Sequence, residues 1–221
     1  MQYFFSPGYL WLVVVSLTAF SLCAISSNAF GQEDVTNDSS PMPRVVEFRI
    51  QEKLFLLELP EWWDEVEVAL PETETHEEFT QYVREFCKKD TGTAETWKSA
   101  FKLWVLYEQT EDEPFPVYPA HCLRAGGQYL AAAKIYSQLQ MLGKYTDNQA
   151  WYETYLAYSA GNAFFEGGQE ALAEAWYEKG LKDNSSTESS VIYYFNKCQE
   201  NLDAVQAGMT PHGLRRNPIA K

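Results

Sequence analysis

Histidine and cysteine, which often act in catalysis or hold metal ions, are few in this 221-residue chain. The sequence contains three histidines, at positions 76, 121 and 212. His76 begins the run HEEFT, which lacks the second histidine of the H-E-x-x-H pattern that places two zinc ligands on one helix face. His121 and Cys122 are adjacent, and adjacent residues of a helix point in different directions. That arrangement suits neither a pair of metal ligands nor a nucleophile and its base.

The glycine pairs and the carboxylates also have simpler explanations than chemistry. Gly126-Gly127 and Gly167-Gly168 each follow one predicted helix and precede another, so we expect turns rather than phosphate-binding loops. Asp and Glu number 31 against 17 Lys and Arg, so carboxylates fall next to one another by composition alone. The sequence therefore predicts a non-catalytic protein with no cofactor and no metal. The alternative is an enzyme or metal protein whose site lies in the N-terminal segment Val45 to Leu70.

The composition indicates one folded core with an acidic surface. Hydrophobic residues make up 46% of the chain and aromatic residues 15%, which is enough apolar material for a single sizeable core. The formal net charge is −14. A surface of that charge repels phosphate backbones, so we do not expect nucleic acid to be a partner.

Residues 1–31 are expected to be a signal peptide. No charged side chain precedes Glu33, and Tyr9 to Ala29 contains an apolar stretch of signal-peptide length followed by small residues that suit cleavage. The segment before Tyr9 has no Lys or Arg, however, and about 20 residues can span a bilayer. Residues 9–29 could instead stay attached as a membrane anchor. An acidic linker is expected at 32–43, and the protein is expected in the periplasm or cell envelope, or anchored to a membrane.

A small β element is predicted at the start of the region 44–110. Apolar residues alternate with polar ones from Val46 to Ile50, as in a half-buried strand, and Leu54 to Leu59 and Val66 to Leu70 are candidates for two more strands. Trp62-Trp63, between these segments, is expected to pack against the core, because aromatic pairs bury large areas.

Two helices are predicted in the second part of this region. Apolar residues recur at helical spacing from Phe79 to Cys87 and again from Trp97 to Tyr107. Thr75 to Glu78 has the form of a capping box at the start of the first helix. Three prolines and three acidic residues between Thr110 and Pro119 predict a loop. At the other end of the chain, residues 207–221 are expected to be a disordered basic tail.

The cysteines beyond the signal segment are expected to pack as thiols. They are Cys87, Cys122 and Cys198, an odd number at wide spacing, which does not suit a disulfide scaffold. Cys87 and Cys198 fall on the apolar stripes of predicted helices, and buried thiols are common there. One pair could still oxidise after export.

The strongest pattern in the chain lies between Ala160 and Leu181. Gly161 and Ala173 place small residues where two antiparallel helices would cross closely, and Phe164 and Tyr177 are large enough to fill the space beside the crossing. Gly168 is expected to end the first helix in a left-handed conformation. This arrangement resembles the tetratricopeptide repeat.

The resemblance extends to both sides at a period of about 34 residues. Asn196 lies 34 positions after Asn162, in a predicted helix with no second helix after it, like the solitary capping helix that closes many such arrays. Upstream, Gly127 to Leu139 matches the second helix of another repeat, whose first helix is predicted at Ala120 to Ala125. The resemblance implies about two repeats and a capping helix over residues 119–206. The fold class is then mainly α, with antiparallel helix-pair repeats and a small N-terminal β element.

The same resemblance implies a binding groove on the inner surface of the stacked first helices. In this family such a groove receives an extended peptide or a partner helix. By position in the motif, nine residues would face it: Tyr155, Tyr158, Asn162, Phe165, Glu166, Ile192, Tyr193, Asn196 and Gln199. The asparagines would hydrogen-bond a ligand backbone, and the tyrosines would give rigid apolar contacts with polar tips. For each aromatic residue, burial in the helix core is the alternative.

These expectations favour an exported scaffold or adaptor that binds a protein or peptide in an aromatic, acidic groove. Tyr158 and Ile192 stand where relatives that clamp a C-terminal carboxylate have lysine, which disfavours a receptor for chaperone tails. A second hypothesis is a structural subunit that self-associates or docks onto a membrane complex of the envelope. It is motivated by the small number of repeats, because about three are normally needed to bury a continuous core.

Overall fold

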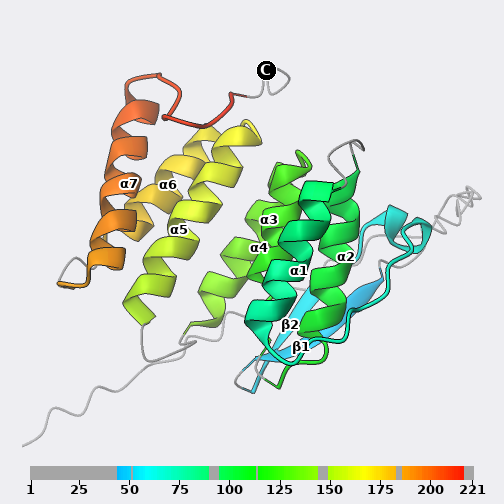
Figure 1. Cartoon of the computed structure of the whole chain (residues 1–221). Helices are drawn as coiled ribbons and strands as arrows, with labels where there is room; N and C mark the ends of the chain where they lie inside the picture. Colours follow the sequence, from blue (N-terminus) through cyan, green and yellow to red (C-terminus); the bar gives the residue numbers. More distant parts are fainter. Residues whose placement is uncertain are drawn as a thin grey trace, which may run out of the picture. The chain divides into compact units, whose positions relative to one another are not determined.

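The computed structural model describes residues 44–50, 52–89, 95–112, 114–143, 149–182 and 186–216. All of them belong to one compact unit, Met42–Lys221. The described part is mainly helical, with one two-stranded antiparallel sheet (Figure 1). The predicted signal segment 1–31, the linker 32–43 and the last five residues of the predicted tail lie outside the described residues.

The sheet is a hairpin of β1 (Val45–Ile50) and β2 (Lys53–Glu58). The strands pair antiparallel with Phe48 opposite Phe55, and the two rings lie 6.0 Å apart. Side chains alternate between the core and the surface, as the period of two predicts. The two predicted strands that form this hairpin are confirmed.

The third predicted strand, at Val66–Leu70, is not formed. This segment follows η1, a 3-10 helix at Glu61–Glu65, and runs without regular structure. Lys102 explains part of the difference, because its Nζ donates to the carbonyl oxygens of Trp63 (2.9 Å) and Val66 (2.7 Å). Those carbonyls are bound to a side chain of α2 (Thr96–Glu108) rather than to a neighbouring strand.

Trp62 and Trp63 pack between the hairpin and the helices, as expected from the sequence. The Trp62 ring meets Trp97 edge-on at 5.2 Å, and both tryptophans meet Phe101 at 5.5 and 6.1 Å. Edge-to-face contacts of this kind stabilise aromatic cores beyond the area they bury. The pair therefore fixes the hairpin against α2.

The first helix, α1 (His76–Lys89), packs on α2 through a second aromatic cluster. Phe79 stacks on Tyr107 at 4.0 Å and meets Trp104 edge-on at 4.9 Å. At the N-terminus of α1, Thr75 Oγ1 accepts the backbone N–H of Glu78 at 3.2 Å. This is the side-chain bond predicted from the capping pattern.

The remaining helices form successive antiparallel neighbours. They are α3 (Val117–Ala125), α4 (Tyr129–Leu142), α5 (Gln149–Glu166), α6 (Glu170–Gly180) and α7 (Ser189–Gln206). α4 packs on α3 and α5, while α7 packs on both α5 and α6 (Figure 1). α3 begins three residues before its predicted start, because Pro119 lies in the first turn, where the missing N–H breaks no helical bond.

Three glycines end helices α3, α5 and α7 in the same way. Gly127, Gly168 and Gly208 have positive φ angles of 77°, 77° and 69°. In each case the next residue donates its backbone N–H to a carbonyl five residues earlier: Gln128 to Leu123, Gln169 to Phe164, and Met209 to Ala204. This is the Schellman pattern, which satisfies the last carbonyls of a helix. The left-handed cap predicted at Gly168 is confirmed.

The segment after α7 packs against the helices over residues 209–216, although the sequence predicts a disordered tail there. Pro211 is buried, and Leu214 contacts the cluster formed by α5, α6 and α7. Arg216 forms an ion pair with Glu170 at 3.2 Å and lies over the ring of Phe165. Short-range patterns did not reveal this docking because its partners lie about one helix pair away in the sequence.

Candidate functional site

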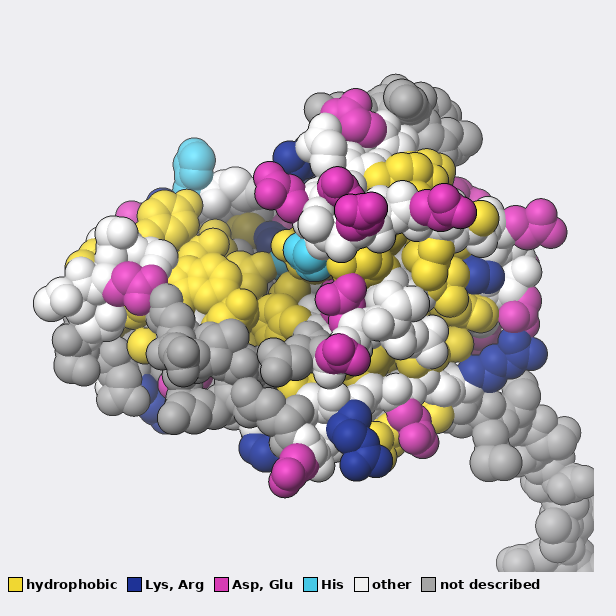
Figure 2. Space-filling model, turned by 60° about the horizontal axis from the view of Figure 1, so that its bottom comes forward, with side chains coloured by type: hydrophobic (Ala, Val, Ile, Leu, Met, Phe, Trp, Pro, Cys, Tyr) yellow, Lys and Arg dark blue, Asp and Glu magenta, His cyan; other side chains and the backbone are white. Residues whose placement is uncertain are grey.

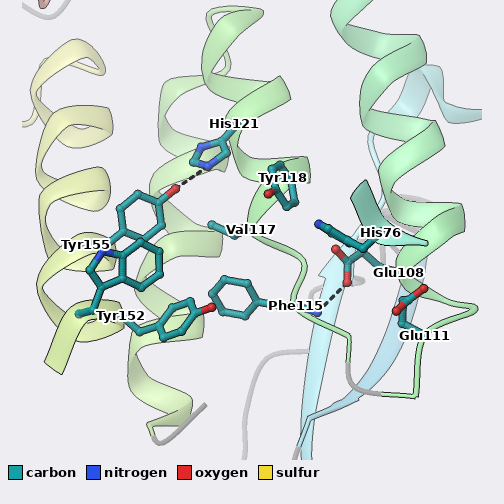
Figure 3. Close-up of a pocket in the computed structure, with 10 residues that line it drawn as sticks. His76, Glu108, Glu111, Phe115, Val117, Tyr118, His121, Tyr152 and Tyr155 are labelled. Carbon is teal, nitrogen blue, oxygen red and sulfur yellow. Dashed lines mark hydrogen bonds between the residues drawn. The ribbon is translucent and has the colours of Figure 1, made fainter. Parts of the chain in front are cut away.

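A pocket of about 260 Å³ opens between α5 and the side of the molecule formed by α1, α2 and α3 (Figure 3). The wall on the α1–α3 side carries His76, Glu108, Glu111, Val117, Tyr118 and His121. The opposite wall carries Trp151, Tyr152 and Tyr155 from α5, and Phe115 lies between the two walls on the loop after α2. The pocket is therefore built from four helices and is largely aromatic, with two carboxylates on one side.

His121 links the two walls and is neutral. One of its ring nitrogens lies 2.5 Å from the hydroxyl of Tyr136, and the other lies 2.6 Å from the hydroxyl of Tyr155. A neutral imidazole donates one of these bonds and accepts the other. Burial, with a further contribution from Arg124, lowers the pKa of His121 to about 4. Because both nitrogens are engaged, the imidazole positions Tyr155 rather than offering a base to a substrate.

Glu108 is the buried acid of the pocket, with only 3% of its surface exposed. Its Oε2 accepts the backbone N–H of Phe115 at 2.6 Å, which folds the loop after α2 back over the end of that helix. Burial raises the pKa of Glu108 to about 7, although the bond from Phe115 acts in the opposite direction. The nearby charge of Glu111 also raises it. At neutral pH the carboxyl is thus close to its midpoint of ionisation.

His76, at the start of α1, stands at the edge of the pocket. Its ring lies 5.6 Å from Trp104, 5.7 Å from Tyr107 and 5.6 Å from Tyr118. Tyr107 also hydrogen-bonds Glu111, and burial together with that bond raises the pKa of Tyr107 to about 12. Aromatic faces and carboxylates therefore occur together on this wall.

An aromatic surface leads from the pocket across α5 to α7. The rings of Trp151 and Tyr155 are stacked at 5.0 Å, and Tyr194 meets both Tyr155 (5.1 Å) and Tyr158 (5.6 Å). Tyr193 continues the series at 5.1 Å from Tyr194 and is 55% exposed. We call these five residues the α5–α7 aromatic surface. Figure 2 shows hydrophobic side chains gathered around a hollow on this face, beside a histidine, with acidic side chains around its edge.

Six of the nine residues predicted to face a groove lie on or near this surface. Tyr155 lines the pocket, and Tyr158 belongs to the aromatic surface. The other four are exposed on α7: Ile192, Tyr193, Asn196 and Gln199. Gln199 donates to Asp203 on the same helix at 2.8 Å. The structure therefore brings these residues of α5 and α7 onto neighbouring helices.

Asn162, Phe165 and Glu166 lie inside the protein instead. Asn162 is 1% exposed, and its Oδ1 accepts bonds from the Tyr177 hydroxyl and the Asn201 amide, both at 2.8 Å. Phe165 is fully buried in the core cluster of α5, α6 and α7. The motif alone does not show that these positions turn away from the surface, because the rotation of α5 depends on how α6 and α7 pack against it.

Glu166 is buried through an ion pair. Its Oε2 lies 2.6 Å from Nε of Arg124, at the end of α3, and only 9% of the glutamate side chain is exposed. Removing either partner would leave a charge poorly solvated. The pair thus joins α3 to α5 and leaves Glu108 and Glu111 as the acids of the pocket.

Sequence reasoning did not find most of the pocket residues. His76, Glu108, Phe115 and Tyr152 come from segments that are far apart in the chain, so no local spacing connects them. One signal was present for Glu108: it follows Trp104 by one helical turn, so it extends the apolar stripe of the predicted second helix. A carboxylate in such a stripe marks either a helix end or a buried polar site.

The thiols are placed for packing. Cys87, Cys122 and Cys198 do not form disulfides with one another. Cys198 is buried against Gly180, where an added Cβ would come within 2.6 Å of its sulfur. Burial raises the pKa of Cys198 to about 12 and also raises that of Cys122. Neither thiol is therefore an activated nucleophile at neutral pH.

Among the described residues, no group of three or more His, Cys, Asp or Glu side chains is arranged to hold a metal ion. Within those residues, no helix combines the length and the apolar character that crossing a membrane requires.

Comparison with known proteins does not assign the chain to a family. No protein-family model, curated protein or solved structure matches it. We therefore argue a function from the pocket and the α5–α7 aromatic surface.

Proposed function

We propose that this protein is an exported, non-catalytic adaptor of tetratricopeptide type that binds a protein or peptide across the pocket and the α5–α7 aromatic surface. The observation that carries the proposal is that the pocket is continuous with the α5–α7 aromatic surface. A pocket of about 260 Å³ opens directly onto a row of aromatic side chains that ends at the exposed Tyr193. Aromatic residues of this kind supply large, rigid contact areas and are enriched where proteins bind one another.

The helix packing supports the tetratricopeptide part of the proposal. α3 with α4 and α5 with α6 would be two helix pairs, and α7 would be the capping helix. The caps at Gly127, Gly168 and Gly208 recur, with the same hydrogen bonds, at the ends of α3, α5 and α7. Gly161 permits the close crossing expected within a pair, since a Cβ there would come within 2.5 Å of the Tyr177 ring. In this arrangement α3, α5 and α7 provide the inner surface.

The N-terminal sequence supports export. An apolar segment at residues 9–29, followed by small residues, has the composition of a signal peptide. If it stays attached, it would hold the adaptor at a membrane and so place the binding surface near partners of the envelope. N-terminal sequencing of the protein purified from its native host distinguishes cleavage from anchoring.

The experiment that tests the adaptor role uses site-specific crosslinking. A photo-crosslinking phenylalanine analogue replaces Tyr193, which is 55% exposed on α7, or Leu172, which is 45% exposed on α6, in the native host. We expect a specific protein to crosslink from position 193 and not from position 172. The same set of proteins at equal yield from both positions would contradict the proposal.

The partner is then purified and its affinity is measured with folded variants. We expect Tyr158→Ala/Tyr193→Ala to weaken binding by about tenfold or more, since both side chains belong to the contact surface. The matched control is Met141→Ala/Leu172→Ala, which removes two exposed apolar side chains from α4 and α6. The control is expected to bind as the wild type does.

A second candidate function is self-association or docking through the hairpin. Val45, Leu54 and Leu56 are 45%, 55% and 43% exposed, so they give the outer face of the hairpin an apolar character. Exposed strands with such a face pair readily with other chains. Light scattering tests this role: the mass of the wild type is expected to rise with concentration and that of Leu54→Ser/Leu56→Ser to stay at one chain. A wild-type mass that is independent of concentration would count against self-association.

A further inference from the structure

The chemistry of the pocket indicates what part of a partner it would receive. Of the described side chains that line it, none is Lys or Arg, whereas Glu108 and Glu111 are carboxylates. His121 is held neutral by burial and by the nearby charge of Arg124, and both of its ring nitrogens are engaged by tyrosine hydroxyls. The rest of the lining is mostly aromatic. A concave site that joins ring faces to carboxylates is complementary to a cation with an apolar stem.

We propose that the pocket receives the side chain of one lysine or arginine of the bound partner, with its cationic end beside Glu108 and Glu111. The inference rests on the proposed function, because it identifies the residue type that the adaptor recognises. The alkyl stem would lie between Tyr118 and Tyr152, which Figure 3 shows on opposite sides of the pocket.

The size of the pocket fits this occupant. Sites for small molecules and cofactors typically enclose about 300–1,000 Å³. A pocket of about 260 Å³ lies below that range and suits a single side chain. The aromatic surface that leads away from it would contact the residues on one side of that side chain. One anchor in a pocket, with weaker contacts around it, is the usual pattern of an interface.

The charges around the pocket favour a cation. Each ring face attracts a cation through its quadrupole, and a bond between a cation and a carboxylate is stronger than a neutral one. The titratable and charged groups around Glu108 come from four helices and the loop after α2: His76 and Arg84 from α1, Tyr107 and Glu111 from α2 and the loop, Tyr118 and His121 from α3, and Tyr152 and Tyr155 from α5. The charge of Arg84 acts to lower the pKa of Tyr118, but Arg84 is absent from the described lining of the pocket.

A cation in the pocket would also change the ionisation of Glu108. Burial holds the pKa of this carboxyl at about 7, so part of the population is protonated at neutral pH. An adjacent positive charge stabilises the carboxylate and lowers its pKa. Binding at pH 7 is therefore expected to release a fraction of a proton, and a neutral ligand of the same shape is expected to release none.

The experiment uses four small probes and the three histidines of the chain. The probes are Nα-acetyl-lysine amide and Nα-acetyl-arginine amide, with the neutral analogues Nα-acetyl-norleucine amide and Nα-acetyl-citrulline amide. Each is titrated into the purified folded protein at pH 7 while the histidine Cε1–H signals are followed by NMR. His76 and His121 line the pocket, and His212 lies outside its described lining, so it serves as an internal reference.

We expect the cationic probes to shift the signals of His76 and His121, but not that of His212. The cationic probes are expected to bind at least about tenfold more tightly than their neutral analogues. The difference between the lysine and arginine probes then identifies the side chain that is preferred. Equal binding of charged and neutral probes, or equal shifts at His212, would overturn the inference.

Variants locate the effect at the two carboxylates. Glu108→Gln/Glu111→Gln is expected to lose the preference for cationic probes and the release of protons on binding. Glu111→Gln alone provides a second test if the double variant does not fold, and it is expected to reduce the preference. The charge-matched control, Glu178→Gln/Glu200→Gln, changes two glutamates of α6 and α7 and is expected to behave as the wild type does. A preference that survives the loss of Glu108 and Glu111 would also overturn the inference.

Failure of this inference differs from failure of the proposed function. If Tyr193 crosslinks a specific partner and the probes show no preference for charge, the adaptor role stands and the pocket has another occupant. If the cationic probes are preferred but no specific partner crosslinks from α7, the pocket binds cations and the adaptor role fails.

Discussion

Asn162 on α5 and Asn196 on α7 lie 34 positions apart in the chain but have opposite environments. Asn162 is buried among α5, α6 and α7, where it accepts bonds from Tyr177 and Asn201. Asn196 is exposed on α7. The repeat pattern places both on one inner surface because it records spacing along the chain and not the rotation of each helix. The difference between them therefore comes from tertiary packing.

This difference predicts the stability of two alanine variants. Asn162→Ala leaves the Tyr177 hydroxyl and the Asn201 amide without their shared acceptor, so it is expected to lower the free energy of unfolding by about 2 to 3 kcal/mol. Asn196→Ala is expected to change it by less than about 0.5 kcal/mol. Urea denaturation followed by circular dichroism measures both. Similar losses in the two variants would contradict a structural role for Asn162.

Glu108 and His121 make opposite contributions to the pH dependence of stability. Burial raises the pKa of Glu108 from 4.5 to about 7, so its stabilising protonated form is complete below pH 4.5 and is lost as the pH rises through about 7. Burial lowers the pKa of His121 from 6.5 to about 4. Its stabilising neutral form is complete above pH 6.5 and is lost as the pH falls through about 4. Between pH 4.5 and 6.5 a rise in pH therefore lowers the stability contributed by Glu108 and raises that contributed by His121.

Removing either group is expected to reveal how the other changes the free energy of unfolding with pH. Over pH 4.5 to 6.5, the free energy of unfolding of Glu108→Gln is expected to rise with pH more steeply than that of the wild type. The two slopes are expected to differ by up to about 1.4 kcal/mol per pH unit. His121→Gln is expected to become less stable as the pH rises over the same range. Urea denaturation at half-unit steps of pH gives the slopes. Variants that both keep the wild-type slope would contradict these assignments.

At the scale of elements, the close crossing of α5 and α6 depends on Gly161. A Cβ at this position would come within 2.5 Å of the Tyr177 ring, and that ring is fully buried and held by its hydroxyl bond to Asn162. Gly161→Ala is therefore expected to cost about 1 to 3 kcal/mol through overpacking, even though alanine favours helix.

Gly167 is the matched control for this substitution. A Cβ there would come within 2.6 Å of Leu130 Cδ2, at the end of a side chain that is 49% exposed, and 3.2 Å from the backbone oxygen of Ala163. Gly167→Ala is expected to lower the melting temperature clearly less than Gly161→Ala does. Equal changes in thermal unfolding would indicate that the crossing tolerates a side chain at position 161.

The elements that local chemistry specifies could be predicted from the sequence. The alternation around Phe48, the cap at Thr75 and the left-handed glycine at position 168 each depend on a few neighbouring residues, and the structure has all three. The strand expected at Val66–Leu70 is not formed, and the carbonyl of Val66 at its start is bound by Lys102 from a distant helix. Elements that depend on partners far away in the sequence are those that spacing alone does not reveal.

The residues of the candidate site could also be predicted only in part from the sequence. Tyr155 and Tyr193 could be predicted from the repeat pattern, which assigned both to a groove, and both belong to the α5–α7 aromatic surface. The carboxylate wall could not be predicted, because Glu108 lines the pocket beside residues of α1, α3 and α5 that are far away in the sequence. The carboxylates that line the pocket belong to α2 and its loop, whereas Glu166, which was predicted for the groove, pairs with Arg124.

At the scale of the whole molecule, the two walls of the pocket differ in how firmly they are held. α5 packs against α4, α6 and α7, and its buried residues include Leu156, Ala160 and Phe165. α1 packs mainly on α2, at the outside of the helical array. Local opening is expected where few contacts hold an element. A ligand that bridges His76 and Tyr155 would thus connect the most firmly packed helix with the least firmly packed one.

This arrangement predicts a graded pattern of hydrogen exchange. In the free protein, backbone amides in the middle of α5 are expected to exchange about 100-fold more slowly than those of α1, because α1 opens locally while α5 opens only on global unfolding. Saturation with the crosslinked partner, once purified, is expected to slow exchange in α1 and to leave α6 unchanged, since binding to the closed pocket stabilises it against local opening. Mass spectrometry of peptides from α1, α5 and α6 gives the rates. Equal protection of α1 and α5 in the free protein would show that both walls are rigid before the partner binds, and the pocket would then be fully preformed.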